Sequence, residues 1–283
     1  MNSYCFNSYA KVNIGLQILN KRPDGYHNIN TLFQEIDLCD TIELRKKKQG
    51  CNFSSNVDWL KNNKSNLCVN AWLQLSHSFD IGGVSIFLKK KIPPGSGLGG
   101  GSSNAAAIIK GLCYLYSIKP IHKDLISIAT NLGADVPFFL NGGLQSASGV
   151  GEKLIPFSGS INGTYLLVIP DCKIDTSWAY NKYKNFLDST REALNFADIL
   201  KGDEIPFKLF ENDFESIVIP AYPEIATIKE KLWSRRPKFV SLSGSGSTVY
   251  GIFDDEAEAK SAESLFSHRY STFIANPVTH MLK

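Results

Sequence analysis

A glycine-rich stretch constrains the fold of this chain more than any other feature. It reads Pro-Gly-Ser-Gly-Leu-Gly-Gly-Gly-Ser-Ser-Asn-Ala-Ala-Ala over residues 94–107, and a strand-like run at 84–88 comes before it. Glycine allows left-handed backbone and a close approach of ligands, and the alanines favour a helix. The free N–H groups at a helix N-terminus attract anions. The stretch therefore predicts a strand, a phosphate-binding loop and a helix, with a merely flexible turn as the alternative.

Two familiar phosphate loops match this stretch poorly. A Walker A loop needs a lysine after its last glycine, and here Gly101 is followed by Ser102. The dinucleotide fingerprint can be placed on the glycines, but it requires an acidic residue at the end of a strand about 20 residues further on. Asp124 stands near that distance in a helix-like context. The loop is thus expected to bind a nucleotide phosphate in a different way.

Composition indicates a globular protein and excludes several classes of function. The chain has 283 residues, 43% of them hydrophobic and 20% charged, with a net charge of +3. The small charge gives no argument for nucleic-acid binding, and the run 45–48 is interpreted as a solvated strand end. No segment approaches the ~18 apolar residues of a membrane span, and the N-terminus lacks signal-peptide features. We expect no membrane partner and leave the oligomeric state open.

The six cysteines are scattered and form no C-x-x-C pair, and the histidines do not cluster with them. This pattern is typical of idle thiols in a reducing compartment, so we expect a cytoplasmic protein without a protein-held metal. The residue pattern mixes strands and helices without strict alternation. Strands are expected at 9–19, 31–44, 84–88, 165–169, 239–242, 248–253 and 272–275, and helices at 67–79, 123–132, 223–233 and 255–266. The turn-forming residues 156–163 indicate a domain boundary.

Three sites carry side chains suited to phosphoryl transfer, which needs charge stabilisation and a base. Lys11 lies among apolar residues on a strand, so it is either a cleft cation or an edge-strand lysine. Asp135 precedes an apolar run and either caps a helix or acts as a base. Tyr26 and His27 follow a turn and suit base stacking and hydrogen bonding, or they pack the turn. The sequence alone does not bring Lys11 and Asp135 together.

Five motifs, taken together, resemble those of the GHMP kinases. They read Ala-Lys-Val-Asn from Ala10, Arg-Pro-Asp-Gly-Tyr-His from Arg22, the glycine loop from Pro94, Gly-Ala-Asp-Val-Pro-Phe from Gly133, and Leu-Ser-Gly-Ser-Gly from Leu242. Their order and their span over nearly the whole chain fit the family. The last turn departs from the Gly-Thr-Gly that relatives often carry, which leaves its side-chain roles open.

The resemblance implies an α+β fold of two domains. An S5-domain-2-like N-terminal domain over 1–157 would carry the nucleotide loop, and a ferredoxin-like C-terminal domain would follow over 158–283. It also implies ATP-dependent phosphorylation of an alcohol. The first two motifs point to the 2-hydroxyl of 4-diphosphocytidyl-2-C-methyl-D-erythritol, an intermediate of the non-mevalonate (MEP) route to isoprenoid and terpenoid precursors.

The resemblance assigns residues to catalysis and to ATP. Asp135 would be the general base, and Lys11 would hold and polarise the hydroxyl and the incoming phosphate. Mg²⁺ would arrive with ATP, held by phosphate oxygens, water and Ser103. The residues implied to bind ATP are Asn66, Lys90, Pro94, Gly95, Ser96, Gly97, Leu98, Gly99, Gly100, Gly101, Ser102, Ser103 and Asn104.

The acceptor site is implied in the same way. Asn13 would position the erythritol part, Tyr26 and Tyr180 would sandwich the cytosine, and His27 would bind its polar edge. Thr176 lies in the same segment as Tyr180, where Trp178 is a rival stacking residue. Other readings are a GHMP kinase for homoserine or mevalonate, against which the Tyr26–His27 turn argues, and a catalytically silent nucleotide- or sugar-binding module. A substrate panel separates the three.

Overall fold

The computed structural model describes residues 2–186, 191–202 and 204–280. The chain forms two compact units that take alternating segments. The first unit contains the chain up to Ala10, Cys39–Pro94 and Gly99–Asn141, and the second contains Lys11–Leu38, Gly95–Leu98 and the chain from Gly142 on. The units follow contacts rather than sequence order, and the expected division between residues 157 and 158 stays a prediction.

Two long strands pass from one unit into the other. These are β1 (Ser3–Lys21) and β2 (His27–Lys47), which pair with each other. The residues of β1 expected to point one way, Val12, Ile14, Leu16 and Ile18, are all buried. The opposite face of this part of β1 is buried as well, and it includes the polar side chains of Lys11 and Asn13.

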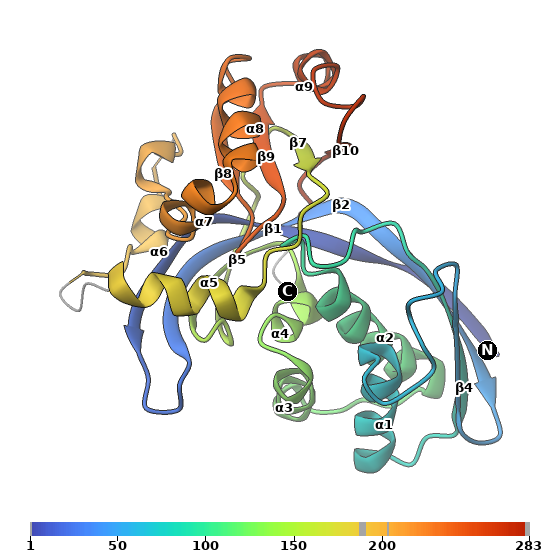
Figure 1. Ribbon diagram of the computed structural model, residues 1–283. Coiled ribbons are helices and arrows are strands. Elements are labelled where there is room, and N and C mark those ends of the chain that lie inside the picture. Colours follow the sequence, from blue (N-terminus) through green and yellow to red (C-terminus); the bar gives the residue numbers. More distant parts are fainter. Residues whose placement is uncertain (1, 187–190, 203, 281–283) are drawn as a thin grey trace. The chain divides into compact units, whose positions relative to one another are not determined.

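In the first unit, helices gather beside a small set of strands. The Thr41–Lys47 part of β2 pairs antiparallel with β4 (Gly83–Lys89), and β3 (Cys51–Ser55) pairs parallel with β4. Four helices contact one another there (Figure 1): α1 (Leu67–Ser78), α2 (Gly100–Tyr116), α3 (His122–Leu132) and α4 (Val136–Asn141). Residues 105–109 of α2 are all buried, as their apolar run requires.

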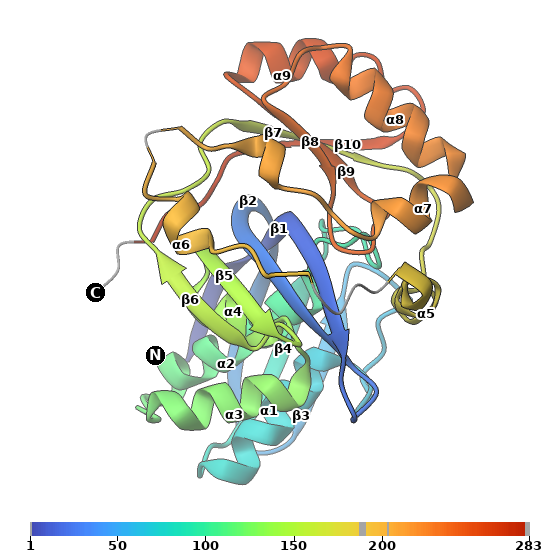
Figure 2. The same cartoon turned by 90° about the vertical axis from the view of Figure 1, so that its left-hand side faces the viewer.

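The second unit contains two sheet regions. The Ile29–Gln34 part of β2 pairs with β5 (Leu144–Gly149), which pairs with β6 (Lys153–Phe157). A separate antiparallel sheet has the order β10 (Ser271–Ala275), β7 (Thr164–Ile169), β9 (Val249–Phe253), β8 (Phe239–Leu242). Helices α8 (Pro223–Trp233) and α9 (Glu256–Glu263) cover this sheet (Figure 2).

Shorter helices complete the second unit. They are α5 (Thr176–Tyr183), α6 (Phe196–Ile199) and α7 (Glu215–Ala221), with 3-10 turns at Lys184–Phe186 and Phe207–Leu209. The core joins β1, the four-stranded sheet and helices α5, α7, α8 and α9. Asp175 caps α5 by accepting the N–H of Trp178.

Most of the expected strands and helices lie within two residues of their predicted bounds, including the helix at 223–233 and the strand at 239–242. The strands predicted at 9–19 and 31–44 are longer than expected. The apolar run after Asp135 is the short helix α4, a length too small for its helical period to be read from the sequence. No helix in the described ranges is long and apolar enough to cross a membrane.

Candidate active site

Lys11 sits in a buried hydrogen-bonded array of the second unit. Its ammonium donates to Asn13 Oδ1 at 2.6 Å and lies 4.9 Å from the centre of the Phe33 ring. Asn13 Nδ2 donates to Thr31 Oγ1 at 2.9 Å, and that hydroxyl donates to the Gly15 carbonyl at 2.6 Å. Only 3% of Lys11 and 2% of Asn13 is exposed. Burying a charge is costly unless it is paired, so the array fixes one orientation of the ammonium.

Tyr250 of β9 completes the support of this strand. Its hydroxyl donates to the Asn13 carbonyl at 2.6 Å. Burial raises the pKa of Tyr250 well above its ordinary value, with a further contribution from Tyr165. The phenol therefore stays protonated at neutral pH and remains a donor. Asn13 is thus held by hydrogen bonds at both its side chain and its main-chain carbonyl.

The tip of the glycine loop, Gly95–Leu98, belongs to the same unit as Lys11. The Lys11 N–H donates to the Leu98 carbonyl at 3.1 Å. The turn after β8 holds the other side: the Thr248 N–H donates to the Ser96 carbonyl at 3.1 Å, and Ser243 Oγ donates to the Gly97 carbonyl at 2.9 Å. Two of the sequence motifs, at 10–13 and at 242–246, therefore hydrogen-bond to the tip of the glycine loop.

The start of α2 belongs to the first unit. Gly99 caps this helix with a φ of 68°, in the left-handed region where glycine is favoured. Ser102 is partly exposed, whereas Ser103 is buried and shares a 2.6 Å hydrogen bond with Ser8. The N-terminus of α2 has no side-chain cap, so its N–H groups suit an anion.

Three further predicted residues lie in the first unit. Asn66 caps α1 by accepting the Cys68 N–H at 2.9 Å, and its amide donates to the Lys61 carbonyl at 3.0 Å. The Lys90 ammonium lies 2.5 Å from Asp40 Oδ2. Asp135 is partly exposed directly before α4. Predicted site residues are thus divided between the units, with Asp135 in the first and Lys11 in the second.

His27 and Tyr180 come together in the second unit. Their rings stack at 5.1 Å with 11° between their planes, and the Tyr180 edge meets Phe214. Burial lowers the pKa of His27, and nearby Lys21 lowers it further. His27 Nε2 is buried without a hydrogen-bond partner among the residues that the structure describes. Such an orphaned group has a free-energy cost that a ligand can remove.

The other aromatic residues of this region are placed differently. Tyr26 is 66% exposed, so its ring is open to a flat ligand. Trp178, two positions before Tyr180 on α5, packs edge-on against Tyr222 and against the core. Tyr180 is therefore the α5 residue whose ring stacks on His27. Thr176 Oγ1 lies 2.9 Å from Ser245 Oγ, which links α5 to the turn after β8.

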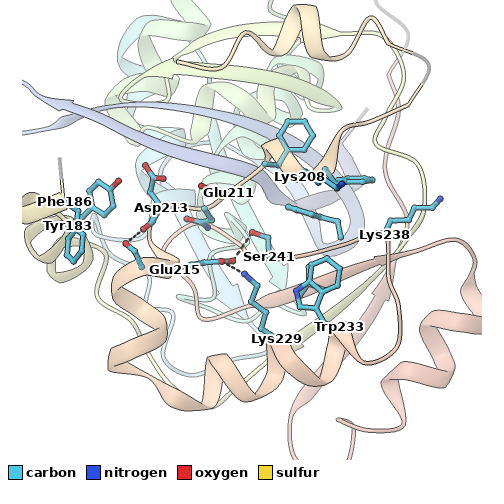
Figure 3. A pocket seen from close by; sticks show the side chains of 16 residues that line it. Tyr183, Phe186, Lys208, Glu211, Asp213, Glu215, Lys229, Trp233, Lys238 and Ser241 are labelled. Carbon is cyan, nitrogen blue, oxygen red and sulfur yellow. Dashed lines mark hydrogen bonds and ion pairs between the residues drawn. The ribbon is translucent and has the colours of Figure 1, made fainter. Parts of the chain in front are cut away.

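A cavity of about 770 Å³ lies in the second unit (Figure 3). None of the predicted site residues lines it. Phe207, Phe210, Phe239 and Trp233 give it an aromatic wall. Its Glu215 contacts Lys229 and accepts hydrogen bonds from Ser241, as Figure 3 shows, and from the Leu242 N–H. Glu215 and Lys229 are thereby paired within the protein.

In the part of the chain that the structure describes, no three His, Cys, Asp or Glu side chains gather to hold a metal ion. The expected Mg²⁺ ligand Ser103 has its hydroxyl against Ser8. The partly exposed Ser102 next to it belongs to the same first turn of α2.

Two family models match the chain, one for the GHMP kinases N terminal domain over residues 66–143 and one for the GHMP kinases C terminal over 195–271. A 4-diphosphocytidyl-2-C-methyl-D-erythritol kinase from Chlorobaculum tepidum is 38% identical, covering 95% of this chain and 96% of the relative. The chain belongs to the GHMP kinase family. A relative of the same name from Chlorobium luteolum is also 38% identical, with 98% of each chain covered.

Solved structures agree with this family membership. A 4-(cytidine 5'-diphospho)-2C-methyl-D-erythritol kinase superposes with a TM-score of 0.83 at 30% identity, covering 98% of this chain and all of the other. A homoserine kinase from Cytophaga hutchinsonii has a TM-score of 0.69 at 19% identity, a likeness of fold alone. The expected α+β, two-domain GHMP kinase fold is confirmed.

Several residues of this GHMP kinase site escaped the sequence reasoning. Thr31 and Tyr250 reach Asn13 from distant parts of the chain, and no local pattern marks them, whereas Ser243 belongs to the motif that begins at Leu242. Asp40 did carry a signal, because a charged residue inside an apolar strand is rarely buried without a purpose.

Proposed function

We propose that this enzyme transfers the γ-phosphoryl group of ATP to the 2-hydroxyl of 4-diphosphocytidyl-2-C-methyl-D-erythritol, in the MEP pathway. The acceptor is taken from the relatives, which carry that name at 38% identity over nearly the full length. The observation that supports the chemistry is the buried Lys11 ammonium, fixed by Asn13 on the strand that also holds the loop tip at Leu98.

In the proposed reaction the acceptor oxygen attacks the γ-phosphorus. A new O–P bond forms, the bond to the β,γ-bridging oxygen breaks, and ADP leaves with that electron pair. Asp135 accepts the hydroxyl proton, and Lys11 stabilises the charge that spreads over the transferring group. Asn13 keeps the ammonium in one place and offers its amide to the acceptor.

The glycine loop and the N-terminus of α2 bind the polyphosphate through backbone N–H groups in this proposal. Mg²⁺ bound with ATP would supply charge neutralisation on the phosphates, and the hydroxyl of Ser102 or Ser103, at the start of α2, would hold it. The residues implied for the adenosine side, Asn66 and Lys90, have side chains already bound within the protein.

The cytosine is proposed to bind at Tyr26, His27 and Tyr180. In the structure the face of Tyr180 is stacked on His27. A cytosine that replaces the His27 ring in this stack would lie against the face of Tyr180. It could also hydrogen-bond to His27 Nε2, an atom that has no hydrogen-bond partner among the described residues. The exposed ring of Tyr26 can cover the other face of the base.

A coupled ADP-release assay tests the proposal. The enzyme is given Mg-ATP with 4-diphosphocytidyl-2-C-methyl-D-erythritol, and in parallel with mevalonate, homoserine or galactose. Turnover confined to the cytidyl substrate is the expected result. Turnover on another alcohol would keep the kinase chemistry but overturn the acceptor site. Nucleotide binding with no turnover on any of the four would favour a silent binding module.

A further inference from the structure

Asp40 is a fully buried carboxylate near the middle of β2, in the first unit. Four donors converge on it. Oδ1 accepts the N–H groups of Lys91 and Ile92 at 2.7 and 2.8 Å. Oδ2 accepts the Lys90 ammonium at 2.5 Å and Asn104 Nδ2 at 2.8 Å. A carboxylate with this many partners is rigidly placed, since each hydrogen bond to a charged group is among the stronger ones.

These donors stand on both sides of the glycine loop. Lys90, Lys91 and Ile92 lead into the loop, and Asn104 lies in the first turn of α2 just after it. Ser8 of β1 also holds the residues that follow the loop. Its hydroxyl accepts a hydrogen bond from Asn104 Nδ2 at 3.0 Å and lies 2.6 Å from Ser103 Oγ. The entry and the exit of the loop are therefore fastened to one carboxylate.

The same contacts decide what Lys90 does. Its side chain is only 7% exposed, and its ammonium lies between Asp40 and Asn104 Oδ1, the latter at 3.5 Å. Gly100 packs directly over it: a Cβ on that glycine would lie 3.2 Å from Lys90 Nζ and 2.9 Å from Ile92 Cγ2. The ammonium is thus enclosed beneath the start of α2, and its charge is matched by Asp40.

We propose that Asp40 is a positioning residue for the phosphate loop, and that Lys90 acts on this loop through Asp40 rather than by touching the nucleoside. The proposal rests on the proposed function in so far as the loop binds ATP. Asp40 and Lys90 hold residues 90–92 and Asn104 so that the N–H groups of the loop and of α2 are arranged before the polyphosphate arrives. Preorganisation of this kind lowers the cost of binding.

The experiment compares two ligands that share the polyphosphate and differ in the nucleoside. Calorimetry measures the dissociation constants of Mg-ATP and of magnesium tripolyphosphate, without any acceptor. The variants are Asp40→Asn, Lys90→Met and the double variant. Glu35→Gln is the matched control, since Glu35 is also a buried carboxylate, bound to the Gly143 N–H and to His280 in the second unit.

Asp40→Asn is expected to weaken both ligands by about the same factor, on the order of ten-fold, because an amide cannot accept from all four donors. Lys90→Met is expected to weaken the binding of both ligands by a similar factor. The double variant is expected to bind them no more weakly than whichever single variant binds them more weakly. Glu35→Gln is expected to lower the melting temperature and leave both dissociation constants unchanged. A merely structural Asp40 would behave as Glu35 does.

Two results would overturn the proposal. One is wild-type affinity for both ligands in folded Asp40→Asn. The other is a Lys90→Met protein that binds Mg-ATP more weakly but tripolyphosphate as the wild type does, which would place Lys90 at the nucleoside. If Asp40→Asn does not fold, Ser8→Ala removes the hydrogen bonds of Ser8 more gently, and equal weakening of both ligands is again required. A wild-type protein that binds neither ligand would instead contradict the proposed nucleotide site.

Discussion

Lys11 and Asp135, the two residues proposed to carry out the phosphoryl transfer, differ in how far they are buried. Lys11 is buried and fixed by Asn13, so its charge is in place before substrates bind. Asp135 is partly exposed at the start of a short helix, where a carboxylate is either a favourable charge at the helix N-terminus or a base within reach of an acceptor. Only a variant that removes the charge and keeps the shape separates these roles.

Asp135→Asn is that variant. If Asp135 accepts the hydroxyl proton, kcat should fall by on the order of 10²–10⁴, while the dissociation constant of Mg-ATP stays close to that of the wild type. Steady-state kinetics with the cytidyl substrate and calorimetry with Mg-ATP measure the two quantities. Near-wild-type kcat with a lower melting temperature would show that Asp135 only supports α4.

His27 gives a prediction for pH. Burial, helped by Lys21, lowers its pKa below the ordinary value of 6.5, so the folded protein binds a proton there less readily than the unfolded chain does. The stability of the folded protein is therefore not reduced by His27 above pH 6.5. Protonation of His27 in the unfolded chain lowers this stability as the pH falls from 6.5 towards the lowered pKa. The neutral His27 ring, which the proposed cytosine site requires, is lost only below that pKa.

The KM for the cytidyl substrate is thus expected to be level at neutral pH and to rise at acidic pH, with the KM for ATP changing less. The pH dependence of both values, measured on the wild type and on His27→Gln, checks this. The variant should have a raised cytidyl KM that no longer responds to acid in this range. A wild-type profile retained in His27→Gln would assign the titration to another group.

At the scale of elements, the glycine loop depends on how closely its tip approaches the turn after β8. Gly97 has a φ of +81°, and a Cβ on it would lie 2.0 Å from the Ser243 carbonyl oxygen. Gly95 has a similar φ of +65°, but a Cβ there would meet nothing within 4 Å. The two glycines therefore separate backbone strain from collision within one loop.

Gly97→Ala is expected to lower the free energy of unfolding by roughly 2 kcal/mol or more, because strain and collision add. Gly95→Ala should lower it by about 1 kcal/mol, from strain alone. Urea unfolding of both variants measures the difference, and Gly97→Ala should also raise the KM for ATP. Equal destabilisation by the two substitutions would mean that the turn does not press on the loop tip.

The elements also show where sequence reasoning succeeds and where it stops. The glycine loop, the helix after it and the alternation around Lys11 were predictable because each depends on neighbours a few positions away. Thr31 and Tyr250 were not, since they reach Asn13 across 18 and 237 positions. Asp40 likewise depends on Lys90–Ile92 and Asn104, some 50 to 64 positions away. The roles of Asp135 and of Tyr180 stay predictions.

At the scale of the whole molecule, nucleotide binding and global stability are linked. A ligand that binds only the folded protein reduces every opening that destroys its site, by a factor close to the ratio of ligand concentration to dissociation constant. The first unit contains a natural reporter of such opening in Cys68, which is buried on α1. Burial raises its pKa to about 12, so the closed protein offers no reactive thiolate there at neutral pH.

Cys68 should therefore react with a thiol reagent only when the first unit opens, far more slowly than the exposed Cys5. Mg-ATP at about 100 times its dissociation constant should slow the labelling of Cys68 by up to about 100-fold and leave Cys5 unchanged. Mass spectrometry of labelled peptides follows both sites in one sample.

Labelling of Cys68 at the rate of Cys5 would contradict its burial. Slow labelling that Mg-ATP does not affect would mean that the opening which exposes Cys68 leaves the nucleotide site intact. In that case the loop and α2 would remain folded while α1 moves away, and stability would be divided at the boundary between these helices.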